Sequence, residues 1–503
     1  MNNNGALRKN LTSNIVLFLL NGIISFWLPP FLIRKLGIGA YGIIPLSTAI
    51  VGYAALVTVA INGSLSRYLA IDIAEKNFDK ASRTFNTSYV AMSVLVVCLL
   101  PIMIYGSLNI SSLISIPNEL IGDSNLLFIC VTVSFALTCF SSLFNSSAYV
   151  ANRLDLVNRV TVINTYVRLI FIFLIFFAFK ISLLGYGISF LAGSLISAAY
   201  SYYLFRKYTP FISLTFKSFD NTILKDLLSM GGWLVVIQLG TILFLQIDLL
   251  VANKMLGNHA AGQYGVLLQW STMVRTFAIT LSGALAPLVL NLYAQKKKQE
   301  MIRLTLLSNK LLTLFISCGV GVLCIVSKPL LTVWVGKGIG EMYWLFIIML
   351  IPLPLNLGVL PLFSINRAYN KVRVPGIFTC VMGIINLLLA ISLIRFTNLK
   401  LYGIAIASAV VLTMKNFLFM PIYTAMNMGV PKITFFRSSI SSILIMLISI
   451  GLMFVYKSYV EIKNWGGIVF HCGFLFLLLA AISFLLLSRS EKESISSSLL
   501  KRK

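Results

Sequence analysis

Long apolar segments, separated by short polar stretches, run from Leu11 to the C-terminus. An α-helix needs about 20 mostly apolar residues to cross the hydrocarbon core of a bilayer, and these segments reach that length. The pattern predicts an all-α integral membrane protein with about fourteen transmembrane helices. The predicted spans are residues 13–33, 40–63, 85–105, 124–147, 160–179, 183–204, 228–252, 263–288, 305–327, 342–363, 375–394, 401–426, 438–456 and 466–487.

The composition supports this prediction. Of the 503 residues, 58% are hydrophobic and 11% are charged, whereas a soluble domain has about 25% charged residues. The first span lacks the small-residue cleavage pattern of a signal peptide, so we predict that it is a retained helix. The seven cysteines all fall inside predicted spans and form no C-x-x-C pair. This is typical of small buried side chains, not of metal ligands or disulfides.

Positive charge is distributed unevenly between the two sides of the predicted membrane protein. With the N-terminus in the cytoplasm, the inner loops and tails hold 26 of the 40 Lys and Arg residues, and the outer loops hold 10. This is the positive-inside distribution, and it places both termini in the cytoplasm. Most of the net charge of +26 is therefore orientation charge beside anionic lipid. We expect no nucleic-acid partner.

The chain carries a weak internal repeat. Tyr41-Gly42 opens the second predicted span and Tyr264-Gly265 opens the eighth, while Tyr186-Gly187 opens the sixth and Tyr402-Gly403 opens the twelfth. The offsets are 223 and 216 residues, so both pairs indicate one duplication of a six-helix unit. Because six is an even number, the two copies enter the membrane in the same orientation. Parallel repeats of this kind place a binding site between them, near the membrane midplane.

The duplication predicts four parts. Residues 1–205 form an N-terminal six-helix lobe, 206–227 a cytoplasmic linker, 228–427 a C-terminal six-helix lobe, and 428–503 two extra C-terminal helices with a cytoplasmic tail. Prolines interrupt three spans, where they either allow bending during a conformational change or only shape the packing. They are Pro29, Pro30, Pro45, Pro352, Pro354 and Pro361.

Four basic residues and one acidic residue lie inside the predicted spans. They are Arg168, Arg275, Lys310, Lys415 and Asp248. A charged side chain at the bilayer centre costs about 2.5–3.5 kcal/mol, so four cations require an explanation. Either they bind protein carbonyls and extend to the headgroups, or they line a wet cavity that receives an anion. The second alternative predicts a transporter of a negatively charged molecule.

The eighth predicted span has a polar face. Gln269, Thr272, Thr276 and Thr280 follow the spacing of one helix face. Arg275 lies beside them near mid-span, and its guanidinium offers a fork of donors that suits phosphate oxygens. We predict that Arg275 and Gln269 contact an anionic substrate. The alternative for Arg275 is a structural pair with a carbonyl or with an acid of a neighbouring span.

The other intramembrane charges have different predicted roles. Lys415 and Arg168 lie mid-span and are second candidates for substrate contact. They rank ahead of Lys310, which lies closer to the cytoplasmic end of its span and can extend to the headgroups. Asp248 is a candidate for binding a coupling proton or sodium ion, because desolvation favours the protonated form of a buried carboxylate. The alternative for Asp248 is a permanent salt bridge that fixes two helices.

Two residues of the first span complete the candidate set. Asn21 lies on a polar face that suits sugar hydroxyls, although asparagine in a membrane helix is as often a link between helices. Arg34 closes the span at the outer face, where it either anchors the helix or guards a cavity mouth. The chain has no G-x-x-x-x-G-K-[ST] stretch, H-E-x-x-H pattern or intramembrane carboxylate cluster. We therefore predict a transporter and not an enzyme, with no cofactor and no metal.

The chain resembles the flippases of the multidrug/oligosaccharidyl-lipid/polysaccharide exporter superfamily. The resemblance is carried by the fourteen spans, the six-plus-six duplication, the cationic spans, Leu36-Gly37 followed by Tyr41-Gly42, and Arg67-Tyr68 before a cytoplasmic loop. It is strongest to the Wzx type, which acts on O-antigen or capsule repeat units. It implies transfer of an undecaprenyl-pyrophosphate-linked oligosaccharide from the inner to the outer leaflet of a bacterial plasma membrane. It also implies alternating access through a basic cavity, with proton or sodium coupling.

Several alternatives stay open. A lipid II flippase has the same layout and a basic cavity. A multidrug exporter of the superfamily should have acids in its cavity helices, where this chain has almost none. A membrane-embedded glycan polymerase or glycosyltransferase needs a large outer loop with arginines or a cytoplasmic acidic motif, and neither occurs. A partner of the polysaccharide polymerase machinery is the last alternative.

Overall fold

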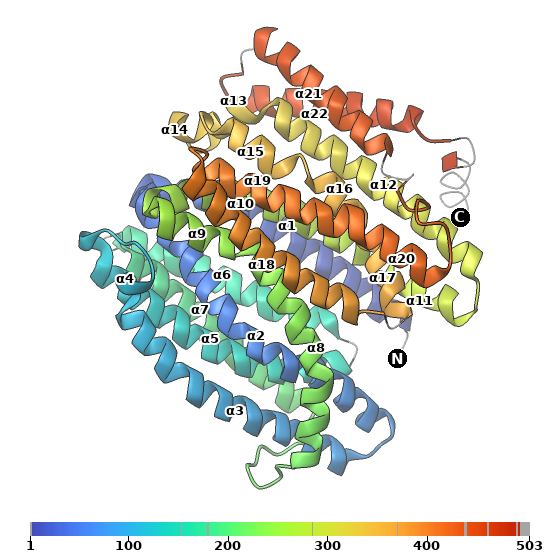
Figure 1. Cartoon of the computed structure of the whole chain (residues 1–503). Helices are drawn as coiled ribbons and strands as arrows, with labels where there is room; N and C mark the ends of the chain where they lie inside the picture. The colour runs from blue at the N-terminus through green and yellow to red at the C-terminus, as the bar shows by residue number, and fades with distance from the viewer. Residues whose placement is uncertain are drawn as a thin grey trace. The chain divides into compact units, whose positions relative to one another are not determined.

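The chain is all helical in the computed structural model, which describes residues 3–151, 153–178, 181–283, 285–369, 371–436, 440–459, 462–488 and 491–492. No strand occurs within these ranges (Figure 1). Two compact units make up the chain, residues 1–265 and residues 266–503. The four parts expected from the duplication, with a linker at 206–227, stay a prediction.

Unit 1, residues 1–265, consists mainly of long helices. They are α1 (Asn3–Leu36), α2 (Ile38–Ala74), α3 (Phe78–Leu108), α4 (Ile110–Leu113), η1 (Asn118–Leu120), α5 (Ile121–Val150), α6 (Leu154–Ala178), α7 (Leu183–Tyr208), α8 (Asn221–Leu245) and α9 (Ile247–Leu256). The next helix, α10 (Asn258–Gly283), begins in unit 1 and ends in unit 2.

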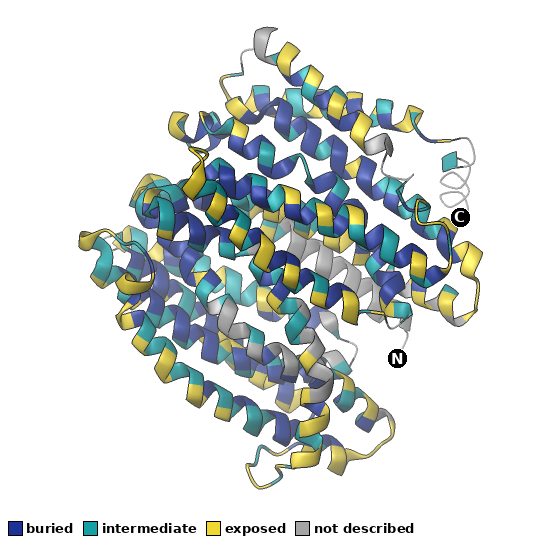
Figure 2. Ribbon diagram, viewed as in Figure 1, coloured by how far each residue is buried: buried dark blue, intermediate teal, exposed yellow. Residues whose placement is uncertain are grey.

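Unit 2, residues 266–503, contains more short helices than unit 1. Its elements after α10 are α11 (Ala286–Ala294), α12 (Lys298–Ile325), α13 (Ser327–Trp334), α14 (Lys337–Gly340), α15 (Tyr343–Leu350), α16 (Leu353–Gly358), α17 (Leu360–Ala368), α18 (Arg373–Phe396), α19 (Leu401–Thr413), the π-helical turn η2 (Met414–Phe419), α20 (Met420–Met428), α21 (Ile440–Tyr459) and α22 (Trp465–Leu485). In Figure 2, α12 is buried over most of its length.

The helix lengths agree with a membrane protein of about fourteen spans. In the part of the chain that the structure describes, 11 helical stretches are long and apolar enough to cross a bilayer. Two shorter apolar stretches, Ile38–Ile50 and Ile443–Tyr456, lie in α2 and α21. The helix α1 is 34 residues long and is a further helix beside these stretches. The predicted all-α membrane fold is confirmed.

The predicted interruption by proline occurs most clearly in span ten. There α15, α16 and α17 replace one continuous helix, and Pro354 and Pro361 each stand in the first turn of a new helix. Proline has no backbone N–H group, but in the first turn of a helix this group has no intrahelical partner in any residue. Proline therefore costs the helix no hydrogen bond there. By contrast, α1 and α2 continue through Pro29, Pro30 and Pro45.

Aromatic packing fills the centre of unit 1. The ring of Phe205 on α7 lies 4.6 Å from that of Phe85 on α3 and 5.2 Å from that of Phe144 on α5, centroid to centroid. All three side chains are buried. A Cβ atom on Gly187 of α7 would lie 3.1 Å from the Cα atom of Leu127 on α5, so these helices pack closely. In a bilayer, such close packing is itself a main source of helix association.

The loop between α7 and α8 is fixed to α3. The Asn86 side chain donates to the Ser213 carbonyl at 3.0 Å and accepts from the Thr215 N–H at 3.0 Å. The Asp220 N–H donates to the Thr87 hydroxyl at 3.1 Å. The segment predicted as a linker is therefore hydrogen-bonded to unit 1 along its length.

The repeated Tyr-Gly segments have a packing role inside unit 1. A Cβ atom on Gly42 of α2 would lie 2.7 Å from the backbone nitrogen of Gly262 on α10. A Cβ atom on Gly262 would collide with the carbonyl oxygen of Ile38. These two helices can approach this closely only because both positions are glycine. Gly42, which belongs to one of the repeated Tyr-Gly pairs, is thus part of a helix contact.

A left-handed lysine follows both α2 and α11. Lys76 and Lys296 have φ of 60° and 58°. The N–H of the following residue donates to the carbonyl five positions earlier, that of Asp72 or Leu292, at 2.9 or 3.0 Å. Asp72 and Leu292 therefore stand at the same position relative to the left-handed lysine.

Candidate functional site

The predicted polar face of span eight is present on α10 in unit 2. Thr272, Thr276 and Thr280 are exposed and Gln269 is half-buried. Each threonine hydroxyl donates to the carbonyl four residues earlier, at 3.0, 2.9 and 2.8 Å. The proton of each hydroxyl is therefore committed to the backbone, while its oxygen can still accept a hydrogen bond. This face offers acceptors at regular spacing.

Arg275 and Lys415 lie close together in unit 2. The Nε–H of Arg275 donates to the Ser271 hydroxyl at 3.3 Å, which holds the guanidinium along α10. Lys415 stands on the π-helical turn η2, near enough to Arg275 for the two charges to repel each other. Both side chains are half-buried. Such π-helical turns are frequent at functional sites. The fold thus brings together two predicted substrate-binding residues that are distant in the sequence.

Carboxylates are almost absent from the spans of unit 2. Its sequence contains no Asp, and its Glu residues are Glu300, Glu341, Glu461, Glu491 and Glu493. Only Glu300 falls inside a candidate span, in the first turn of α12, where it pairs with Lys297 at 3.4 Å. The sequence of unit 2 therefore places net positive charge within the membrane.

Two asparagines near Lys415 did not stand out in the sequence analysis. Asn356 of α16 donates to the Thr413 hydroxyl at 3.3 Å, and Asn416 follows Lys415 on η2. Both are buried, and in the described part of the chain the Oδ1 atom of each has no hydrogen-bond partner. The prolines around Asn356 were the feature of the sequence that could have singled it out. These amide oxygens add acceptors for hydroxyl groups beside the cations.

Arg168 lies in unit 1 and is packed between rings. Its guanidinium carbon lies 4.7 Å from the ring centroid of Tyr186 and 4.5 Å from that of Phe190, both on α7. The side chain is half-buried, and its Nε atom has no hydrogen-bond partner among the described residues. A guanidinium over aromatic faces gains cation–π attraction. This geometry fixes α6 against α7.

Asp248 is buried in the first turn of α9 in unit 1. The Tyr264 hydroxyl of α10 donates to its Oδ2 atom at 3.0 Å. Tyr264 belongs to the repeated Tyr-Gly motif and is itself buried. The carboxylate is therefore positioned by a neighbouring helix. The role of Asp248 in ion coupling stays a prediction.

The remaining candidates are Lys310, Asn21 and Arg34. Lys310 of α12 binds Glu491 at 2.7 Å and the Leu486 carbonyl at 3.1 Å, so it holds the segment after α22. Asn21 and Arg34 are both exposed on α1, and Arg34 stands in its last turn.

The chain is similar to known proteins. The model of the family described as "Polysaccharide biosynthesis protein" matches residues 7–292. The "Uncharacterized membrane protein EpsK" of Bacillus subtilis (strain 168) is 29% identical over 487 residues, which cover 97% of this chain and 96% of that protein.

Solved structures of transporters share the fold. The lipid II flippase MurJ in an inward closed conformation is 16% identical with a TM-score of 0.69, over 93% of this chain and 98% of MurJ. An inward-facing multidrug resistance MATE family transporter of the MOP superfamily is 13% identical with a TM-score of 0.64, over 86% of this chain and 94% of that one.

A MOP superfamily transporter from Pyrococcus furiosus Vc1 (DSM3638) is 13% identical with a TM-score of 0.62, over 84% of this chain and 96% of that transporter. At these identities the likeness concerns the fold alone. The family model covers more than half of the sequence. The chain is therefore a multi-pass membrane protein that belongs to the polysaccharide biosynthesis protein family.

Proposed function

We propose that the protein is a flippase for an undecaprenyl-pyrophosphate-linked oligosaccharide, an O-antigen or capsule repeat unit. It moves this lipid from the inner to the outer leaflet of a bacterial plasma membrane by alternating access. Membership in the polysaccharide biosynthesis protein family and the shared fold of MOP transporters support this proposal. The positive-inside distribution of Lys and Arg supports cytoplasmic termini.

The proximity of Arg275 and Lys415 carries the proposal. Each charge at bilayer depth costs about 2.5–3.5 kcal/mol, and repulsion between the two adds to that cost. A pyrophosphate would offset it, because it brings two or more negative charges and several acceptor oxygens. The guanidinium fork suits bidentate contact with phosphate, and the ammonium acts as a point charge. The scarcity of acids in the spans of unit 2 supports an anionic substrate over a cationic drug.

The polar groups around this pair suit the sugar part of the substrate. The threonine oxygens and Gln269 on α10, together with the amide oxygens of Asn356 and Asn416, can accept hydrogen bonds from sugar hydroxyls. Arg168 ranks behind Arg275 and Lys415, because its guanidinium is stacked on two rings of its own unit. Asp248 is proposed as the site of a coupling proton or sodium ion.

The proposal is tested by complementation in a bacterium that lacks its own repeat-unit flippase. Surface polysaccharide and the lipid-linked intermediate of the cytoplasmic leaflet are scored together. The wild-type chain should restore the polysaccharide and clear the intermediate. With confirmed expression and a matched substrate, persistence of the intermediate refutes the proposal. Units that reach the outer leaflet but stay unpolymerised support translocation.

A lipid II flippase is the second candidate, favoured by the likeness to MurJ over 93% of the chain. Its substrate shares the polyprenyl pyrophosphate group, so the Arg275–Lys415 pair suits it equally. The two candidates differ in the sugar part. Depletion of the native lipid II flippase in the same bacterium separates them, because only a lipid II flippase restores growth.

A further inference from the structure

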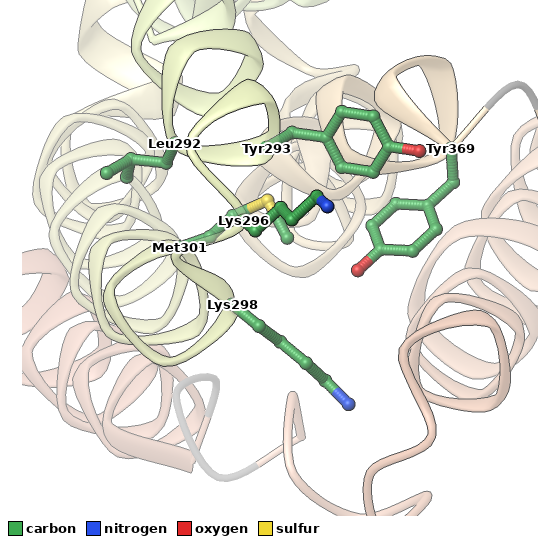
Figure 3. A pocket seen from close by; sticks show the side chains of 6 residues that line it. All are labelled: Leu292, Tyr293, Lys296, Lys298, Met301 and Tyr369. Carbon is green, nitrogen blue, oxygen red and sulfur yellow. The ribbon is translucent and has the colours of Figure 1, made fainter.

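A cavity of about 390 Å³ opens beside the turn between α11 and α12 in unit 2 (Figure 3). Residues from α11, α12, α17 and the adjoining turns line it: Leu292, Tyr293, Lys296, Lys298, Met301 and Tyr369. In Figure 3, Lys296 extends toward the tyrosine rings and the Tyr369 hydroxyl points back toward the lysines. The volume is in the range of small-molecule sites. We call it the lysine–tyrosine pocket.

Lys296 occupies a backbone conformation that normally selects glycine. Its φ is 58°, and it follows α11 at the position where a left-handed glycine commonly ends a helix. A side chain in the left-handed region is strained. Residues that keep such strain are concentrated at binding sites. This strained conformation therefore favours a binding role for the Lys296 side chain, which extends over the pocket.

The turn after α2, where Lys76 is also left-handed, offers a comparison within the chain. At the position that Leu292 has in the turn after α11 it carries Asp72, which is buried and pairs with Lys80 at 3.0 Å. Asp72 also accepts a hydrogen bond from Thr84 at 2.8 Å. The turn after α2 therefore holds a carboxylate of its own, whereas the turn after α11 has leucine at that position and a cavity with two lysines beside it.

The lysines of the turn have different neighbours. Lys297 turns to Glu300, with which it forms an ion pair at 3.4 Å, and it does not line the pocket. Lys298 lies beside Gly429, which ends α20; a Cβ atom on that glycine would be 3.9 Å from the lysine Nζ atom. The negative end of a helix dipole stabilises a cation at such a position. The lysines that line the pocket are thus the ones not paired to Glu300.

We propose that the lysine–tyrosine pocket binds the phosphate-bearing headgroup of a lipid in the inner leaflet. Lysine ammonium groups bind phosphate oxygens as point charges, and tyrosine hydroxyls donate to the same oxygens. The pocket lies at the start of the span α12, and tyrosines are enriched at the membrane interface, where headgroups lie. Basic pockets between transmembrane helices on the cytoplasmic side bind such headgroups.

The headgroup has two sources, an anionic phospholipid or the pyrophosphate lipid of the proposed function. In the second case, which rests on that function, the pocket is a loading site for the substrate. Full-length protein in neutral detergent is titrated with dioctanoyl phosphatidylglycerol, farnesyl pyrophosphate and the zwitterionic control dioctanoyl phosphatidylcholine. Tighter binding of one of the two anionic probes identifies the source.

The double variant Lys296→Gly/Lys298→Ala tests the pocket itself. Each lysine contributes about fivefold to the binding of an anionic headgroup, so binding should weaken roughly 25-fold. Lys297→Ala is the matched control, because it removes the same charge from the same turn outside the pocket, and it should change binding less than twofold. Lys296→Gly relieves the left-handed strain, so loss of folding does not explain its effect.

Two results would overturn the pocket proposal. One is equal binding of the zwitterionic and anionic probes by the wild-type protein. The other is a loss of about fivefold in Lys297→Ala, the loss expected for each pocket lysine, which would mean that only the overall charge of the turn matters. The complementation assay is read separately. Export that fails in the wild-type chain refutes the flippase proposal and leaves the headgroup measurement unaffected.

Discussion

Gly262→Ala tests the close contact between α2 and α10. The added Cβ atom would overlap the carbonyl oxygen of Ile38, a backbone atom that cannot rotate away. Overpacking of this kind costs about 1–3 kcal/mol. Replacing glycine inside a helix returns up to about 1 kcal/mol through better helix propensity. Because the obstacle is backbone, we expect a net loss of about 1–2 kcal/mol.

The control for this change is Gly319→Ala in α12, where a Cβ atom would meet nothing within 4 Å. It should leave the stability unchanged or raise it slightly. Thermal unfolding of the purified protein in detergent, followed by tryptophan fluorescence, compares the two variants. A midpoint in Gly262→Ala that is equal to or above that of Gly319→Ala would show that the helices do not approach as closely as the structure has them.

Three further changes test other contacts. Burial alone would raise the pKa of Glu491, but hydrogen bonds from Lys310 and Ser488 lower it below its usual 4.5. Its contribution to stability is therefore complete above that value and lost as the pH falls below it, and Glu491→Gln should flatten the stability profile below pH 4.5. Asp248→Asn keeps an acceptor for Tyr264 but removes the charge. The variant should fold normally and lose the dependence of transport on an ion gradient. Gradient-driven transport at the wild-type rate would exclude Asp248 as the coupling site. Arg168→Lys keeps the charge but loses the planar stacking. We therefore expect a free energy of unfolding lower by about 0.5–2 kcal/mol, with transport retained. A transport defect at unchanged stability would contradict the packing role.

The fold class could be predicted from the sequence because membrane spans follow from one-dimensional information. Apolar runs of sufficient length and the bias of Lys and Arg between loops depend on no long-range contact. The repeat was also visible, although its physical reason was not. Only the structure places Gly42 against Gly262, since the sequence does not say which helices touch.

The candidate site was predictable in its residue types and less so in its geometry. Arg275 and Lys415 stood out because a charge in an apolar span is costly, and the fold brings them close together. Lys310 was equally visible, but it binds Glu491, whose position beyond α22 depends on the tertiary fold. Asn356 and Asn416 carry no charge, so nothing in the apolar pattern distinguished them from amides that link helices.

The central claim is that the cations of unit 2 move a lipid-linked anion across the membrane. Its most direct test is a leaflet assay in proteoliposomes, with a fluorescent pyrophosphate-linked oligosaccharide whose exposure is read by a membrane-impermeant quencher. A charge-assisted hydrogen bond contributes about 1.5–3 kcal/mol, so Arg275→Ala/Lys415→Ala should slow transfer at least about tenfold. The surface variant Lys328→Ala, which removes an exposed ion pair with Glu341 and a contact with the Tyr343 ring, should transfer at the wild-type rate. Wild-type transfer by the double variant would contradict the account.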